Sequence, residues 1–107
     1  MWEGWNRDYC SGVTAHEYTH AWQAEHCPSG QDIVLKEGFA NWIEMKYYDA
    51  TGAYQFADNV RQEADPVYGV GVKTMMALED KIGAKKLVEL VQRVSTMAEV
   101  EKVLGRK

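Results

Sequence analysis

The feature that most constrains the fold is the near absence of alternating apolar and polar residues, the pattern that a half-buried strand requires. No segment of the 107 residues alternates cleanly over six or more positions. Apolar residues instead recur at the spacing of amphipathic helices. The sequence therefore predicts a mainly α fold, a compact bundle of about five to six helices.

Residues that break or cap helices divide the chain into these elements. Cys27-Pro28-Ser29-Gly30 should end a first helix, because proline cannot continue a helix and glycine favours a turn. We expect that helix over residues 11–25, with Ser11 as its candidate N-cap. The other helices are expected over residues 34–48 and 54–62, from the segment Tyr68-Gly69-Val70-Gly71 to Ile82, over residues 87–94, and from a capping-box pattern at 96–99 to Leu104.

Length and composition predict one domain over residues 1–107. Hydrophobic residues make up 46% and charged residues 26%, which is globular rather than disordered composition. The formal net charge is −4 and no lysine or arginine cluster is present, so nucleic acid is not an expected partner. A whole protein and a piece of a longer one both stay open.

Membrane and disulfide signals are weak. No apolar stretch approaches the length of a bilayer span, and no signal peptide opens the chain. We therefore expect no membrane partner and leave the compartment unknown, with the cytoplasm slightly favoured. Cys10 and Cys27 are too far apart for a paired-thiol metal site, and we interpret them as unpaired thiols.

His16-Glu17-Tyr18-Thr19-His20 forms the pattern HExxH within the first expected helix. At about 100° per residue, positions four apart lie about 40° apart, so both imidazoles project from one face. Glu17 is then placed to reach a water on the metal rather than the metal itself. Hydrolytic zinc sites need such nitrogen ligands, an open position and a carboxylate that accepts a proton. Because so short a pattern also arises by chance, a third ligand has to decide.

The third ligand has two candidates, His26 and Glu37. His26 lies six residues after His20, as in the pattern HExxHxxGxxH, but Gln23 stands at the position of the glycine. On an unbroken helix His26 would point about 100° or more away from the other imidazoles, so we place it outside the metal site, at most on its rim. Glu37 lies at the start of the next helix, where the helix dipole alone would also favour a carboxylate.

Glu37-Gly38-Phe39-Ala40 resembles the EGFA stretch of gluzincin peptidases, the clan of aminopeptidase N and leukotriene A4 hydrolase. The resemblance implies that Glu37 is the third zinc ligand. It also implies that Tyr68 donates a hydrogen bond to the tetrahedral oxyanion and that Asn41 orients His16. The chain most resembles the bacterial DA-one-like peptidase domain, through HExxHAW, the EGxxxxxE run from Glu37 to Glu44, and YGxG, within residues 10–95.

This resemblance implies a peptidase with one zinc ion that hydrolyses peptides or proteins by a metal-activated water, with Glu17 as the general base. Gluzincins carry a β-sheet before the HExxH helix, yet only about ten residues precede the helix expected here. We therefore expect that sheet to be absent or minimal, and a partner domain could complete the cleft. The alternatives are a catalytically inactive zinc-binding interaction domain and a plain helical partner-binding domain.

Overall fold

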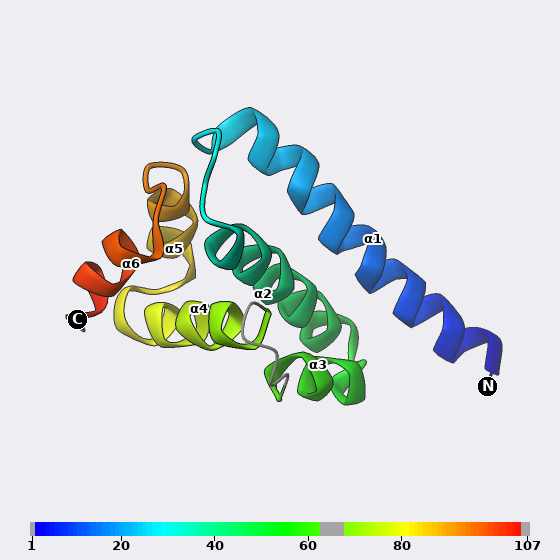
Figure 1. The fold of residues 1–107 in the computed structure, drawn as a ribbon. Coiled ribbons are helices and arrows are strands. Elements are labelled where there is room, and N and C mark those ends of the chain that lie inside the picture. Colours follow the sequence, from blue (N-terminus) through cyan, green and yellow to red (C-terminus); the bar gives the residue numbers. More distant parts are fainter. Residues whose placement is uncertain (1, 63–67, 106–107) are drawn as a thin grey trace.

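The computed structural model describes the backbone of residues 2–62 and 68–105 and the side chains of residues 14–62 and 69–105. These residues form helices and no strand, which confirms the expected mainly helical bundle. No helix in this described part of the chain is long and apolar enough to cross a membrane. The helices are α1 (Trp2–His26), α2 (Ile33–Thr51), α3 (Tyr54–Arg61), α4 (Tyr68–Ile82), α5 (Ala84–Val91) and α6 (Met97–Leu104) (Figure 1).

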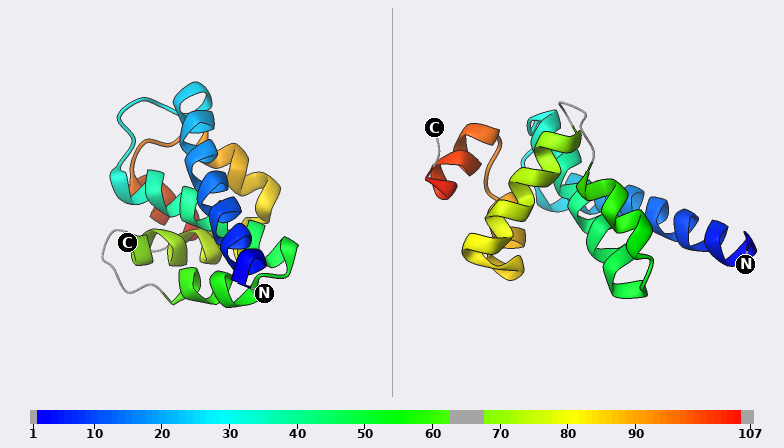
Figure 2. Two further views of the ribbon diagram at one scale, coloured as in Figure 1. Left: turned by 90° about the vertical axis from the view of Figure 1, so that its right-hand side faces the viewer. Right: turned by 90° about the horizontal axis from the view of Figure 1, so that it is seen from below.

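The first helix begins earlier than its sequence suggested. α1 already starts at Trp2, so Ser11 lies inside the helix and the prediction that it is the N-cap is wrong. Residues 2–10 contain no proline, and a glycine within a helix costs only about 1 kcal/mol, too little to end it. The N-terminal half of α1 consequently projects beyond the other helices (Figure 2).

The last helix has the capping box that its sequence predicted. The Thr96 hydroxyl accepts the backbone N–H of Glu99 at 3.3 Å, and the Glu99 carboxylate accepts the backbone N–H of Thr96 at 3.1 Å. Two otherwise unpaired donors at the start of α6 are thereby satisfied. The backbone N–H of Ser95 lowers the pKa of Glu99 most, and the backbone N–H and the hydroxyl of Thr96 lower it further.

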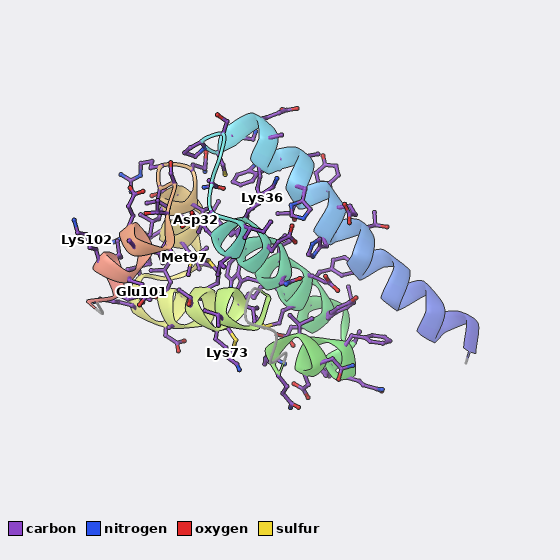
Figure 3. All side chains as sticks on the ribbon, viewed as in Figure 1. Asp32, Lys36, Lys73, Met97, Glu101 and Lys102 are labelled. Atoms are coloured by element: carbon purple, nitrogen blue, oxygen red, sulfur yellow. The ribbon has the colours of Figure 1, made fainter. Side chains whose placement is uncertain are left out.

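The turn between α1 and α2 is fixed by the C-terminal helices. The Gln31 amide donates to the carbonyls of Val91 and Val94, at 2.9 and 2.7 Å. Asp32 accepts the backbone N–H of Met97 at 2.9 Å where α6 begins (Figure 3). Within this turn Cys27 is a free thiol, as expected; the side chain of Cys10 lies outside the described residues. From the turn, α2 runs back antiparallel to α1 (Figure 1).

α2 is the central helix of the bundle, with α1 against one side and α3 and α4 against others. Its apolar face contributes a buried side chain to the core at every turn. The buried side chains described on α1 are instead the polar Thr19 and Gln23. The core is formed by Leu35, Phe39, Trp42, Met45 and Tyr48 of α2, with Phe56, Ala57, Val72, Met75, Leu78, Leu87, Leu90, Val91, Val94 and Val100.

Two glycines let α4 cross α2 at backbone contact. A Cβ on Gly71 would lie 2.5 Å from the Val34 carbonyl oxygen and 2.7 Å from the Cα of Gly38. A Cβ on Gly38 would lie 2.6 Å from the Cα of Gly71. Since backbone atoms cannot move aside as a side-chain tip can, both positions require glycine. The contact fixes the residue that directly follows Glu37 in α2.

We predict that Gly71→Ala destabilises the fold by about 1–3 kcal/mol, because the added methyl group has no space between the two backbones. Helix propensity alone would favour alanine by about 1 kcal/mol, so the sign of the effect separates the two explanations. Denaturant unfolding measures it, with Lys73→Ala at an exposed position of α4 as the control. Equal or greater stability of Gly71→Ala would contradict the close crossing.

Candidate metal centre

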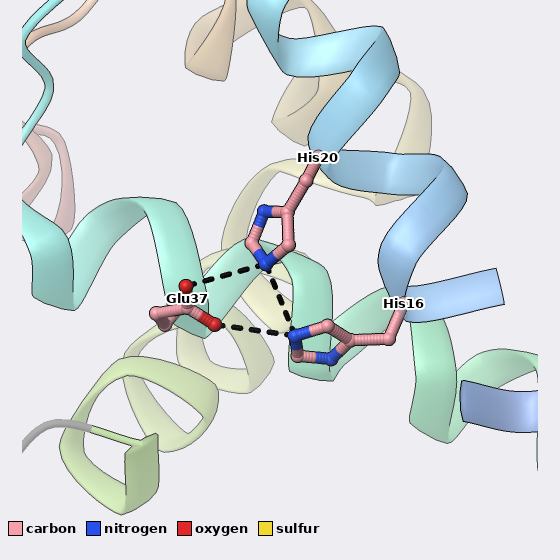
Figure 4. A group of neighbouring side chains, drawn as sticks. All are labelled: His16, His20 and Glu37. Carbon is pink, nitrogen blue, oxygen red and sulfur yellow. Dashed lines mark hydrogen bonds and ion pairs between the residues drawn. The ribbon is translucent and has the colours of Figure 1, made fainter. Parts of the chain in front are cut away.

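His16, His20 and Glu37 converge between α1 and the beginning of α2 (Figure 4). The Nε2 atoms of the two imidazoles are 3.1 Å apart. The Glu37 carboxylate faces both of them, with Oε1 at 3.1 Å from His16 Nε2 and Oε2 at 3.2 Å from His20 Nε2. The three side chains are 15–21% exposed, so the cluster is partly buried and open to solvent on one side.

The far side of the His16 ring is held by a carboxylate. His16 Nδ1 lies 3.0 Å from Glu44 Oε1, and the Tyr48 hydroxyl donates to the other oxygen of Glu44 at 2.9 Å. A carboxylate only accepts, and acceptors face both ring nitrogens, Glu44 at Nδ1 and Glu37 at Nε2. When the proton is on Nδ1, bound by Glu44, the lone pair of His16 Nε2 points toward His20 and Glu37, as a metal ligand requires.

The His20 ring is held in the same sense by an amide. His20 Nδ1 lies 2.8 Å from Gln23 Oε1, while Gln23 Nε2 donates to the backbone carbonyl of Lys36 at 3.0 Å. Because the carbonyl requires the NH₂ end of the amide, the oxygen end must face His20. Gln23 therefore favours the neutral ring form with its proton on Nδ1, in which the Nε2 lone pair also points into the cluster.

Two lone pairs and a carboxylate thus face one another at close range, an arrangement that a proton or a cation stabilises. The hydrogen bond to Glu44, opposed by burial and assisted by Glu37, raises the pKa of His16, so this ring holds a proton more tightly than an ordinary histidine does. A cation fits as well. Ligand atoms in a tetrahedral zinc site with bonds of 2.0–2.1 Å lie about 3.3 Å apart, close to the separations given above.

The donor set matches zinc in kind as well as in spacing. Two imidazole nitrogens and one carboxylate oxygen are the ligands of a catalytic zinc site, which keeps a fourth position open. Oxygen-preferring cations such as magnesium would be held less well by the two nitrogens. The residues present therefore fit a zinc ion, and zinc binding stays a prediction.

The other candidates from the sequence lie outside this cluster. His26 is exposed at the end of α1 and packs against the Trp22 ring, with 5.1 Å between ring centroids. The expectation that His26 lies outside the metal site agrees with this position. Glu17 is exposed beside His16 and has no hydrogen bond or ion pair with the described residues.

The residue expected to orient His16 was Asn41, and the structure instead places Glu44 on the ring. Both lie on the Glu37 face of α2, but Glu44 is almost two turns along from Glu37 and Asn41 only one. Because α1 and α2 are antiparallel (Figure 1), His16, which precedes His20 on α1, lies beside the later turn of α2 and contacts Glu44. The run from Glu37 to Glu44 in the sequence contained this signal.

Tyr68 is the first residue of α4, and its side chain lies outside the described residues. Its backbone is one turn before Gly71, which contacts Gly38 next to Glu37. The first turn of α4 thus packs against the turn of α2 that carries Glu37. The proposed oxyanion role of Tyr68 stays a prediction.

Comparisons with protein-family models, with curated proteins and with solved structures give no match. The resemblance to gluzincins therefore depends on the motif residues alone. What the fold adds is their arrangement, since residues on two different helices meet at ligand spacing.

We predict that the protein binds one zinc ion per chain and that His16→Ala, His20→Ala and Glu37→Ala each weaken binding more than about 100-fold. Loss of a direct ligand should exceed the 10- to 100-fold effect of an orienting residue. Competition with a chelator measures the affinity. His26→Ala is the matched control on the same helix and should bind as wild type does. Wild-type affinity in Glu37→Ala would exclude this ligand set.

The raised pKa of His16 predicts a pH-dependent stability of the metal-free protein. A folded-state pKa above the unfolded value stabilises the fold fully below about pH 6.5, and this contribution is lost as the pH rises through the folded pKa. Glu44→Gln removes the charge that causes most of the shift. In chelator-treated protein, the stability difference between wild type and Glu44→Gln should shrink as the pH rises, and NMR titration should show a lower His16 pKa in the variant. A pH-independent difference would contradict this cause.

Proposed function

We propose that the protein is a zinc-dependent peptidase of the gluzincin type, with His16, His20 and Glu37 as the metal ligands. The observation that carries this proposal is the convergence of three ligand groups, with an acceptor on Nδ1 of each imidazole that favours the metal-binding tautomer. Purely structural histidines would not need two Nε2 lone pairs aimed at one carboxylate.

A zinc ion bound here would supply a Lewis acid that polarises a carbonyl group and lowers the pKa of water. Glu17 is the residue of the chain that would take the proton of the attacking water and return it to the leaving amine. It directly follows His16 on the helix, about 100° around the axis, so it lies next to the ligand face rather than on it. Its lack of partners leaves it available for this work.

The substrate would be a peptide or protein, and Tyr68 would donate a hydrogen bond to the oxyanion that develops during its hydrolysis. The partly exposed cluster leaves room for an extended chain to approach. A partner domain could supply the strand that gluzincins use to hold such a chain.

The second candidate function is that of a zinc-binding interaction domain without activity. It is favoured by the absence of any strand among residues 2–62 and 68–105, which leaves no sheet edge in this part of the chain for a peptide to pair with. Both functions share the metal centre, and they differ in whether Glu17 has a role.

We predict that Glu17→Gln retains zinc and fold but loses at least about 10²-fold in peptide hydrolysis, because the amide cannot accept the proton. The assay is cleavage of a peptide library by the zinc-loaded protein. Glu25→Gln changes another exposed carboxylate of α1, about 180° around the helix from His16, and should remain as active as wild type. Unchanged activity in Glu17→Gln would exclude Glu17 from the mechanism. A wild type that binds zinc but cleaves nothing would favour the interaction domain.

A further inference from the structure

Gln23 is a buried polar residue in the interface between α1 and α2, with 4% of its surface exposed. A buried amide is costly unless both its ends are satisfied. Here the oxygen accepts from His20 Nδ1 at 2.8 Å and the nitrogen donates to the Lys36 carbonyl at 3.0 Å. The amide therefore connects one helix that carries a metal ligand to the other.

We infer that Gln23 is a positioning residue of the metal centre, a role that rests on the proposed zinc site. It fixes the tautomer of His20 and ties that ring to the residue directly before Glu37. The second and third ligands are thus held at a set separation by one side chain. Glu44 holds His16 in a comparable way. Its other hydrogen bond is to Tyr48 of its own helix, so among the described side chains it makes no link between α1 and α2 apart from the His16 ring.

Geometry separates this role from simple packing. A residue that only filled the interface would be apolar, as the buried residues of the facing helix α2 are. A residue that only satisfied the Lys36 carbonyl would need a donor and no acceptor. Gln23 provides a donor and an acceptor at once. Its acceptor oxygen faces His20 Nδ1, and a proton on Nδ1 leaves the lone pair of His20 on Nε2.

The variants follow from the space around the amide. A cavity of about 310 Å³, lined by Gln23, Cys27, Gln31 and Lys36 among others, adjoins this position. In Gln23→Ala, water from the cavity could replace the amide, so Gln23→Leu is the cleaner change because it keeps the volume. Gln23→Glu keeps the acceptor for His20 and removes the donor to the Lys36 carbonyl.

A matched control is available in Gln31. Its amide also makes two hydrogen bonds across the bundle, to the carbonyls of Val91 and Val94, without touching the metal cluster. Gln31→Leu should therefore destabilise the fold in the way Gln23→Leu does, and leave zinc binding unchanged.

The experiment measures two properties of each folded variant. The first is the His20 tautomer in metal-free protein, by ¹⁵N NMR of the ring at a pH above the titration of both imidazoles. The second is the affinity for Zn²⁺ alone, by competition with a chelator. In Gln23→Leu we expect His20 to lose its fixed Nδ1–H form and the zinc affinity to fall about 10- to 100-fold. In Gln23→Glu the tautomer should persist, and the affinity should fall less than in Gln23→Leu, because the acceptor for His20 remains while the tie to the Lys36 carbonyl is lost.

An unchanged tautomer in Gln23→Leu, or an equal loss of zinc affinity in Gln31→Leu, would overturn the inference. Loss of the tautomer in Gln23→Glu would also overturn it, since the acceptor is still present there. If Gln23→Leu does not fold, Gln23→Glu carries the test by itself. A wild type that binds no zinc would refute the proposed function, while the metal-free tautomer would still test the bond between Gln23 and His20.

Discussion

Apart from Trp22, which stacks on Phe39, the packing of α1 against α2 is polar, and the candidate site is a consequence of that fact. α1 presents Thr19 and Gln23 as its buried side chains, with His16 and His20 beside them. Each of these polar groups must find a partner when the helices meet, because an unsatisfied one would cost more than the contact gains. The described side chains contain no buried polar atom without a partner. Glu37, Glu44 and the Lys36 carbonyl supply partners from α2, while Thr19 donates to the Ala15 carbonyl of its own helix.

Most of the helical organisation could be predicted because local residues determine it. Pro28 and Gly30 end α1, Gly52 in the left-handed conformation ends α2, and Thr96 starts α6, each through interactions within a few residues. The start of α1 could not be predicted in this way. No local signal marked it, and Ser11 was chosen only because serine is a frequent N-cap. The crossing of α2 and α4 at Gly38 and Gly71 is a contact between distant residues, which periodicity along one helix does not reveal.

The candidate site also shows this difference between local signals, which could be predicted, and contacts between distant residues, which could not. His16 and His20 were found together because a spacing of four residues places both on one face of a helix. Glu37 required a resemblance, since nothing local to α2 links it to α1. The orienting residues were missed because they depend on the offset between two antiparallel helices. That offset brings Glu44 rather than Asn41 to His16, and it gives Gln23 a partner on α2.

The ligands and the proposed base are held very differently. His16, His20 and Glu37 contact one another and are braced by Glu44 and Gln23, so their geometry is set by several contacts at once. Glu17 is exposed and takes part in none of this network. Metal binding would therefore survive changes that abolish hydrolysis, whereas the reverse would not hold. If the proposed function holds, replacing Glu17 alone would leave a zinc-binding domain without activity.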